Sequence, residues 1–236
     1  MSWYRMLNRL LIAVVAFSSF AASSAHGAPR VAERRWPLDA TQLQLVRCRA
    51  QEIDYRGRHA LRLMPLAGQE RTDTCMIAVI TGREFRGGTI ALDVAGSPRL
   101  DIAPGSRGFI GLAFHVSTEP EGYECFYVRP TNARCDDQLR RNHTVQYVAA
   151  PDFPWQRLRQ ESPGVYESYA DMETGAWTHL ELRVAGTHAE LFVNGASQPA
   201  LIVNDLKLGD PGGPIALWSW TYTDGYFANL TVTPKD

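Results

Sequence analysis

Lysine, long apolar runs and the common nucleotide-binding motifs are scarce or missing in this sequence. Lysine occurs only as Lys207 and Lys235, so nearly all the cations are arginine. The balance of 24 Lys and Arg against 25 Asp and Glu argues against binding to nucleic acid or to an anionic membrane surface. The sequence has no Walker loop, no dinucleotide fingerprint and no serine or cysteine nucleophile motif. Arginine suits carboxylates and planar polar groups as a bidentate partner, although a GC-rich coding sequence gives the same bias.

An apolar run near the N-terminus, residues 10–17, is too short to cross a bilayer. It follows Arg5 and Arg9 and precedes small residues, which is the pattern of a secretory signal peptide. We expect cleavage after Ala25 or Gly27, and no cysteine lies there to carry a lipid. A retained N-terminal anchor is the alternative. Loss of the leader changes the net charge from −1 to −3, because both arginines go with it.

The domain organisation follows from the absence of linkers, repeats and low-complexity runs. We expect residues 1–27 to be the signal peptide and residues 28–236 to form a single domain. The mature protein is then exported to the periplasm or the medium of a bacterium and has no membrane span.

Short segments of alternating polar and apolar residues fill the rest of the sequence and predict an all-β fold. One helix is expected at residues 155–161, and Asn194-Gly195 is a turn signal after a strong hairpin. Short strands with frequent turns favour an antiparallel sandwich or jelly roll. The expected strands are residues 43–55, 60–66, 76–80, 88–94, 108–116, 122–129, 143–148, 177–184, 188–193, 201–203, 215–221 and 226–232.

Polar donors are densest between Tyr123 and Trp155. Successive side chains of a strand point to opposite faces, so Tyr127 and Arg129 share one polar face. Gln146 is expected on the polar face of the strand that follows the loop. A ligand that lies across this face is one interpretation. The other is a salt-bridged surface crossover tied down by a disulfide, because surface ion pairs are common and contribute little.

Two further strands carry candidate contacts. Gly111 and Ala113 alternate with core residues, which suggests close approach by a ligand or another backbone, and His115 ends that row. An exposed histidine without a role is the alternative. Trp218 and Trp220 lie on the face opposite the apolar residues of their strand, where they either stack against a sugar ring or pack under a loop.

All four cysteines follow the leader, and an even number in an oxidising compartment predicts two disulfides. Three pairings are possible. We favour Cys48 with Cys75 and Cys125 with Cys135. The spacings do not fit a zinc site.

Several segments together resemble a known family. The chain resembles the bacterial secreted domain family called 3-keto-disaccharide hydrolase, within the concanavalin A-like lectin and glucanase superfamily, over residues 43–232. Its hairpin and last strand also look like laminin-G domains. The segments that carry the resemblance are FIGLAFH, YECFYVRPTNAR, RRNHTVQY, PDFPWQRLR, WTHLELRVAGTHAELFVNG, PALIVNDLKLG and GYFANLTV.

This resemblance implies a concanavalin A-like jelly-roll sandwich of two antiparallel sheets that binds carbohydrate on one sheet or its rim. Members described as enzymes act on glycosides oxidised at C3, although fold alone does not determine function. The positions that match the family's motifs and become candidate ligand contacts are Tyr127, Arg129, Asn132, Arg141, His143 and Gln146.

The residues do not fit ordinary glycoside hydrolysis, which needs two carboxylates beside the scissile bond. The sequence nearest to the glucanase motif E-x-D-x-x-E contains Glu52 and Asp54 but has no third acid, so we interpret it as a solvated strand end.

Cleavage of a 3-keto glycoside does not need two carboxylates, because one base can start β-elimination and a cation can stabilise the enolate. His143 is the candidate base, with Arg129 or Arg141 as the oxyanion partner. Asp93 and His115 are alternative bases, expected on the same face.

Two other functions stay open. One is a lectin-like module in which the same side chains hold a saccharide without reaction, and the other is a structural or protein-interaction domain. No cofactor is predicted, although Asp136 and Asp137 raise calcium as a loop-ordering ion.

Overall fold

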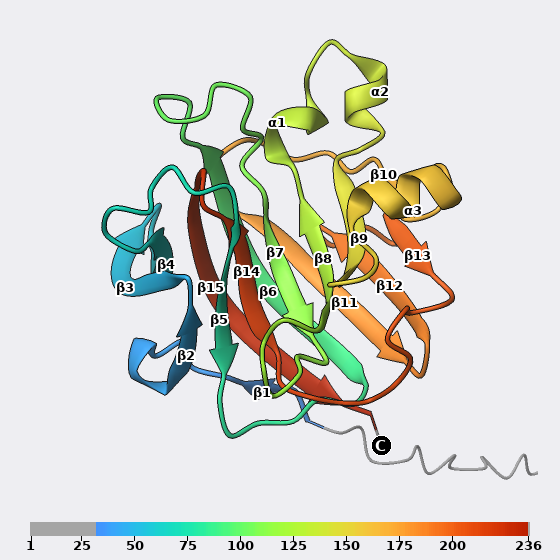
Figure 1. The fold of residues 1–236 in the computed structure, drawn as a ribbon. Helices are drawn as coiled ribbons and strands as arrows, with labels where there is room; N and C mark the ends of the chain where they lie inside the picture. Colours follow the sequence, from blue (N-terminus) through green and yellow to red (C-terminus); the bar gives the residue numbers. More distant parts are fainter. Residues whose placement is uncertain (1–31, 236) are drawn as a thin grey trace, which may run out of the picture. The chain divides into compact units, whose positions relative to one another are not determined.

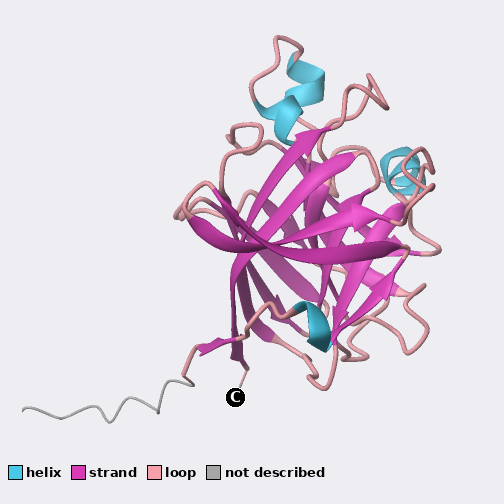
Figure 2. Cartoon of the chain, turned by 90° about the vertical axis from the view of Figure 1, so that its left-hand side faces the viewer, coloured by secondary structure: helices cyan, strands magenta, loops and turns pink. Residues whose placement is uncertain are grey.

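Two antiparallel β-sheets form the body of the computed structural model, which describes residues 32–235 (Figure 1). Strands dominate and only short helices interrupt them (Figure 2). The expected all-β jelly roll is therefore confirmed. The predicted signal peptide, residues 1–27, lies outside the described residues.

The eight-stranded sheet contains the predicted hairpin near one edge. In that hairpin Leu182 pairs with Leu191 and Val184 with Ala189. The order of the sheet is β13 (Leu201–Val203), β12 (His188–Val193), β11 (Thr178–Ala185), β6 (Gly88–Pro98), β15 (Thr223–Pro234), β4 (Arg58–Pro65) and β3 (Cys48–Tyr55), with β1 (Arg34–Arg35) paired to β15.

The seven-stranded sheet contains the polar stretch singled out in the sequence. Its order is β10 (Glu167–Ser168), β9 (Val145–Ala150), β8 (Tyr123–Val128), β7 (Ile110–Phe114), β14 (Ala216–Trp220), β5 (Cys75–Ile80) and β2 (Leu43–Val46).

The core lies between the two sheets and follows the predicted alternation. Leu92 on β6 and Leu112, Phe126 and Leu217 on the other sheet are fully buried. Burial of a side chain of this kind contributes about 1.5–3 kcal/mol, so the alternating strands determine which face of each sheet points inward. The opposite face of the seven-stranded sheet is thereby free to carry polar and aromatic groups.

The structure departs from the sequence prediction most clearly at one strand and one loop, and the short strands β1 and β10 were not expected. The expected strand 43–55 breaks at Arg47, whose φ of 57° ends β2, so that β2 and β3 join different sheets. The polar loop contains two short helices, α1 (Pro130–Ala133) and α2 (Gln138–Arg141). Proline at the first turn suits α1. Asp137 caps α2 by accepting the Arg140 N–H at 3.1 Å.

The other helices are η1 (Ala40–Gln42) and α3 (Trp155–Glu161), the latter at its predicted bounds. Within residues 32–235 no helix has both the length and the apolar character needed to cross a membrane. Helix α3 follows β9 and, with the loops beside β5 and β7, borders the outer face of the seven-stranded sheet (Figure 1).

Candidate functional site

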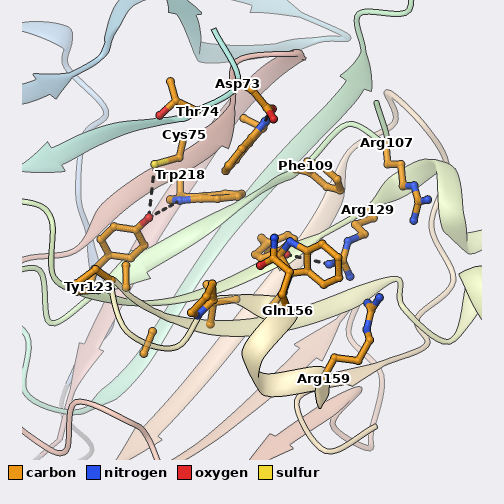
Figure 3. Close-up of a pocket in the computed structure, with 18 of the residues that line it drawn as sticks. Asp73, Thr74, Cys75, Arg107, Phe109, Tyr123, Arg129, Gln156, Arg159 and Trp218 are labelled. Carbon is orange, nitrogen blue, oxygen red and sulfur yellow. Dashed lines mark hydrogen bonds between the residues drawn. The ribbon is translucent and has the colours of Figure 1, made fainter. Parts of the chain in front are cut away.

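A groove of about 660 Å³ opens on the outer face of the seven-stranded sheet, a volume within the usual range for small-ligand sites. Its lining comes from β8, β9 and β14, from helix α3, and from the loops before β5 and β7 (Figure 3). The lining residues are Asp73, Thr74, Cys75, Gly105, Arg107, Phe109, Tyr123, Tyr127, Arg129, Val148, Ala149, Ala150, Pro151, Pro154, Trp155, Gln156, Arg159, Trp218 and Trp220.

Two stacked aromatic rings form the floor of the groove. Tyr127 and Trp218 lie with their ring centroids 4.8 Å apart and their planes 26° from parallel. Gly111 on β7 pairs with both residues, and a Cβ at that position would lie 2.5 Å from the Cα of Tyr127. The predicted close approach at Gly111 is thus to a neighbouring strand. Burial raises the pKa of Tyr127 to about 12, which keeps its hydroxyl neutral.

The rim carries aromatic rings that are more accessible. The Trp218 side chain is only 3% exposed, whereas Trp155 at the start of α3 is 37% exposed. Trp220 is partly exposed, and its Nε1 donates to Asp73 Oδ1 at 2.7 Å. The tryptophans therefore divide between a buried floor and a rim that can contact a ligand.

Arg129 combines burial with a scaffolding role. It is 4% exposed and stacks over Tyr127 and Phe109. Its Nη1 donates to the carbonyl of His143 at 2.7 Å, and its Nη2 donates to Tyr127 Oη and to Gln146 Oε1. These bonds fix the guanidinium at one end of the groove, where Figure 3 shows it between Arg107 and Arg159.

A buried carboxylate holds the third arginine of that end. Glu167 on β10 accepts from Arg159 Nε at 2.9 Å and from Arg159 Nη2 at 2.6 Å. The Nδ1 of His143 lies 3.0 Å from the same carboxylate. Burial, together with the charges of Arg159, Arg129 and Arg107, lowers the pKa of His143, although Glu167 opposes the shift.

Four of the predicted site residues line the groove, namely Tyr127, Arg129, Trp218 and Trp220. The other residues of the polar loop do not. His143 faces Glu167, and Arg141 donates to the carbonyl of Cys135 at 2.6 Å.

The side-chain amides of Asn132 and Gln146 form hydrogen bonds with the backbone and with neighbouring side chains. The Asn132 Nδ2 donates to the His143 carbonyl, and Gln146 Nε2 donates to the carbonyls of Tyr147 and Tyr166. Both residues are buried. They hold Arg129 and the loop in place and do not line the groove.

Asp93 and His115 do not share a face, contrary to expectation, because β6 and β7 belong to different sheets. Asp93 is held on the eight-stranded sheet by His179 Nδ1 at 2.8 Å and Asn229 Nδ2 at 2.7 Å. His115 has a φ of 51°, is 2% exposed and packs against Phe114, and burial lowers its pKa. Neither residue lines the groove.

The predicted disulfides are not formed, and all four cysteines are free in the described structure. Cys125 lies within β8 opposite Ala113 and Val148. Cys135 lies in the loop between α1 and α2, beyond the end of β8, and its Sγ–H contacts the carbonyls of Asn132 and Asp137. The Sγ–H of Cys48 contacts the carbonyl of Ile77, and the Sγ of Cys75 accepts from Arg47 Nη2.

The acidic pair considered for calcium lies in the loop that leads into α2. Asp137 caps α2, and among residues 32–235 no group of three or more His, Cys, Asp or Glu side chains is placed to hold a metal ion.

Sequence reasoning missed the contribution of helix α3 and of the loop before β7. Trp155 and Arg159 both line the groove, and the guanidinium of Arg159 lies 4.6 Å from the Trp155 ring. The helix had been predicted, and the spacing of four residues indicates a shared face. Arg107 carries no comparable signal, because only the fold brings its loop to the groove.

Comparison with known proteins identifies the fold as a galectin-like jelly roll. A carbohydrate-binding module, CBM66, from Bacillus subtilis is 12% identical with a TM-score of 0.53, and the match covers 83% of this chain and 99% of the module. A protein of unknown function with a galectin-like fold, also from Bacillus subtilis, is 12% identical with a TM-score of 0.52 over 82% of this chain and 90% of that protein. No protein-family profile and no curated protein matches the sequence.

Proposed function

We propose that the groove binds a saccharide. The observation that carries this proposal is its lining, which contains three of the chain's six tryptophans beside charged and amide side chains. Sugars combine an apolar, C–H-rich ring face with hydroxyl groups, so aromatic rings and polar donors together suit them. The likeness to a carbohydrate-binding module supports the proposal at the level of the fold.

The lining favours binding over hydrolysis by paired carboxylates. Among the groove-lining residues of the described structure, Asp73 is the single carboxylate, and it accepts a hydrogen bond from the indole N–H of Trp220. Glycoside hydrolysis ordinarily uses two carboxyl groups that flank the bond.

Elimination on a 3-keto glycoside needs only one base, but His143 is turned to Glu167 and does not line the groove. The binding proposal therefore does not rely on His143. Export also belongs to the proposal, supported by the N-terminal pattern of residues 1–27, and N-terminal sequencing of the secreted protein tests it.

Ligand-observed NMR with a panel of neutral and charged oligosaccharides tests the proposal. We expect saturation transfer to at least one oligosaccharide. Trp155→Ala should reduce its affinity by about two- to twelvefold, the equivalent of the 0.5–1.5 kcal/mol of an aromatic contact. Tyr169→Ala is the matched control, because this ring is 46% exposed and does not line the groove.

Three outcomes separate the functions. Binding that Trp155→Ala weakens and Tyr169→Ala does not weaken supports a saccharide site in the groove. Equal effects of the two substitutions place the binding elsewhere and contradict the proposal, as does the absence of binding to every member of the panel. Release of a monosaccharide during the same experiment would show cleavage in addition to binding.

A further inference from the structure

Positive charge is concentrated at one end of the groove. Arg107, Arg129 and Arg159 line this end, which we call the arginine end (Figure 3). Burial, together with the charges of Arg140, Arg129 and Arg159, lowers the pKa of Arg107. Among the described residues, Glu167 is the single carboxylate that pairs with any of these four side chains. The arginine end therefore has an excess of positive charge.

This excess does not reflect a basic protein. The whole chain has a formal net charge of −1, so the excess of positive charge is a local property of the arginine end. Like charges held together at partly buried positions repel one another, and burial of a charge without an opposite partner is unfavourable. An anion at the arginine end would offset both effects.

The arginine end also retains unused hydrogen-bond donors. Arg107 is partly exposed, and its side chain makes no hydrogen bond or ion pair within residues 32–235. Arg159 uses Nε and Nη2 on Glu167, which leaves Nη1 available. The guanidinium of Arg129 makes three hydrogen bonds to neighbouring residues. A guanidinium has five N–H groups, so not all of its donors are used. Guanidinium groups bind carboxylates and sulfates through paired N–H donors.

Aromatic rings border the same groove. Trp155 stacks under the Arg159 guanidinium at 4.6 Å, and Phe109 lies 5.6 Å from the guanidinium of Arg129. A ligand that reaches the arginine end consequently also meets apolar ring surface. This combination distinguishes the site from a simple anion pocket, which needs no aromatic wall.

We infer that the groove selects an anionic saccharide, with its carboxylate or sulfate at the arginine end and a sugar ring against the aromatic rim. The inference rests on the proposed function and adds the charge of the ligand. Arg107 is the residue that determines specificity, because its donors are uncommitted. Arg129 is a binding residue that also supports the loop.

Matched pairs of probes separate charge from sugar recognition. Trigalacturonate is compared with its neutral methyl ester, and a sulfated chondroitin disaccharide with its unsulfated counterpart, by titration calorimetry at low and at physiological salt. We expect the charged member of one pair to bind about tenfold or more tightly, the scale of a charge-assisted hydrogen bond. Salt should reduce that difference only in part, since partly buried charges are screened less than exposed ones.

Arg107→Gln tests the assignment within the protein. It should remove most of the preference for the charged member and leave affinity for the neutral member within about twofold. Arg157→Gln is the control, because it removes the same charge from the exposed side of α3, where Arg157 pairs with Glu161.

Each result decides the inference. A preference for the charged probe that Arg107→Gln removes and Arg157→Gln keeps supports it. Equal binding of the charged and neutral members overturns the inference while the proposed saccharide function stands. Equal loss in both variants also overturns it, because a long-range charge effect then explains the preference. If no probe of either pair binds, both the inference and the proposed function fail.

Discussion

Gly111 offers the sharpest test of how the groove is built. It lies on β7 where the strand pairs with β8 and β14, directly beneath the stacked rings of Tyr127 and Trp218. A Cβ at this position would lie 2.1 Å from the carbonyl oxygen of Phe126 and 2.5 Å from the Cα of Tyr127. Both obstacles are backbone atoms of the neighbouring strand, so no side-chain rotation can relieve the clash.

Gly111→Ala should therefore destabilise the fold and displace the groove floor together. Overpacking of a tightly packed site costs about 1–3 kcal/mol, and the involvement of backbone places this case near the upper end. In a domain of this size about 3 kcal/mol corresponds to a fall in Tm of about 6–12 °C. Urea unfolding followed by tryptophan fluorescence measures the loss of stability directly, since Trp218 is next to the substitution.

Gly105→Ala is the matched control for Gly111→Ala. Gly105 also lines the groove, but a Cβ there would meet no atom within 4 Å. Replacement of glycine at a tolerant position changes stability by less than about 1 kcal/mol, often favourably. If Gly111→Ala unfolds at the same urea concentration as Gly105→Ala, the close approach of the strands does not exist as described, and the account of the floor is refuted.

Two further predictions concern the charged networks. Glu167→Gln should lower the free energy of unfolding by about 2 kcal/mol. Loss of a fully buried ion pair costs about 3–5 kcal/mol, but the side chain of the partner Arg159 is 34% exposed. The control Glu161→Gln, in an exposed pair, should lower it by at most about 0.5 kcal/mol, and equal losses in urea unfolding would contradict this ranking. The hydrogen bond to Asp93 raises the pKa of His179 above 6.5, so the stabilisation that it contributes is complete below pH 6.5 and is lost as the pH rises through the folded-state pKa. Hydrogen bonds from His179 and Asn229 lower the pKa of Asp93 despite its burial. The stability that the Asp93 carboxylate contributes is therefore lost as the pH falls through its folded-state pKa. NMR titration should place the pKa of His179 above 6.5 in the wild type and lower in Asp93→Asn, and an unchanged value would show that the pair does not interact.

The division between inward and outward faces could be predicted from the sequence because it depends on local alternation. Strict alternation placed Tyr127 and Arg129 on one face of β8 and Trp218 and Trp220 on one face of β14, and all four line the groove. Helix α3 was expected at its observed bounds. Such patterns follow from the two-residue period of a strand and the 3.6-residue period of a helix, and both can be recognised within a short stretch of sequence.

The misplaced residues have a different origin. Asp93 lies in β6 and His115 directly follows β7, and alternation does not reveal that these two strands join different sheets. Proximity in sequence suggested that His143 and Arg141 would share the ligand with Arg129. Two short helices instead turn them to Glu167 and to the loop backbone.

The sequence by itself therefore determined the all-β class, most of the strand segments and the inward face of the strongly alternating strands, because these depend on residues two to four positions apart. Only the tertiary structure decided which strands became neighbours and which loops bordered the groove. Arg107, Arg129 and Arg159 come from three separate segments, and their meeting at one end of the groove follows from the pairing order of the seven-stranded sheet and the docking of α3. That pairing is a long-range packing choice, so no local pattern of residues contains it.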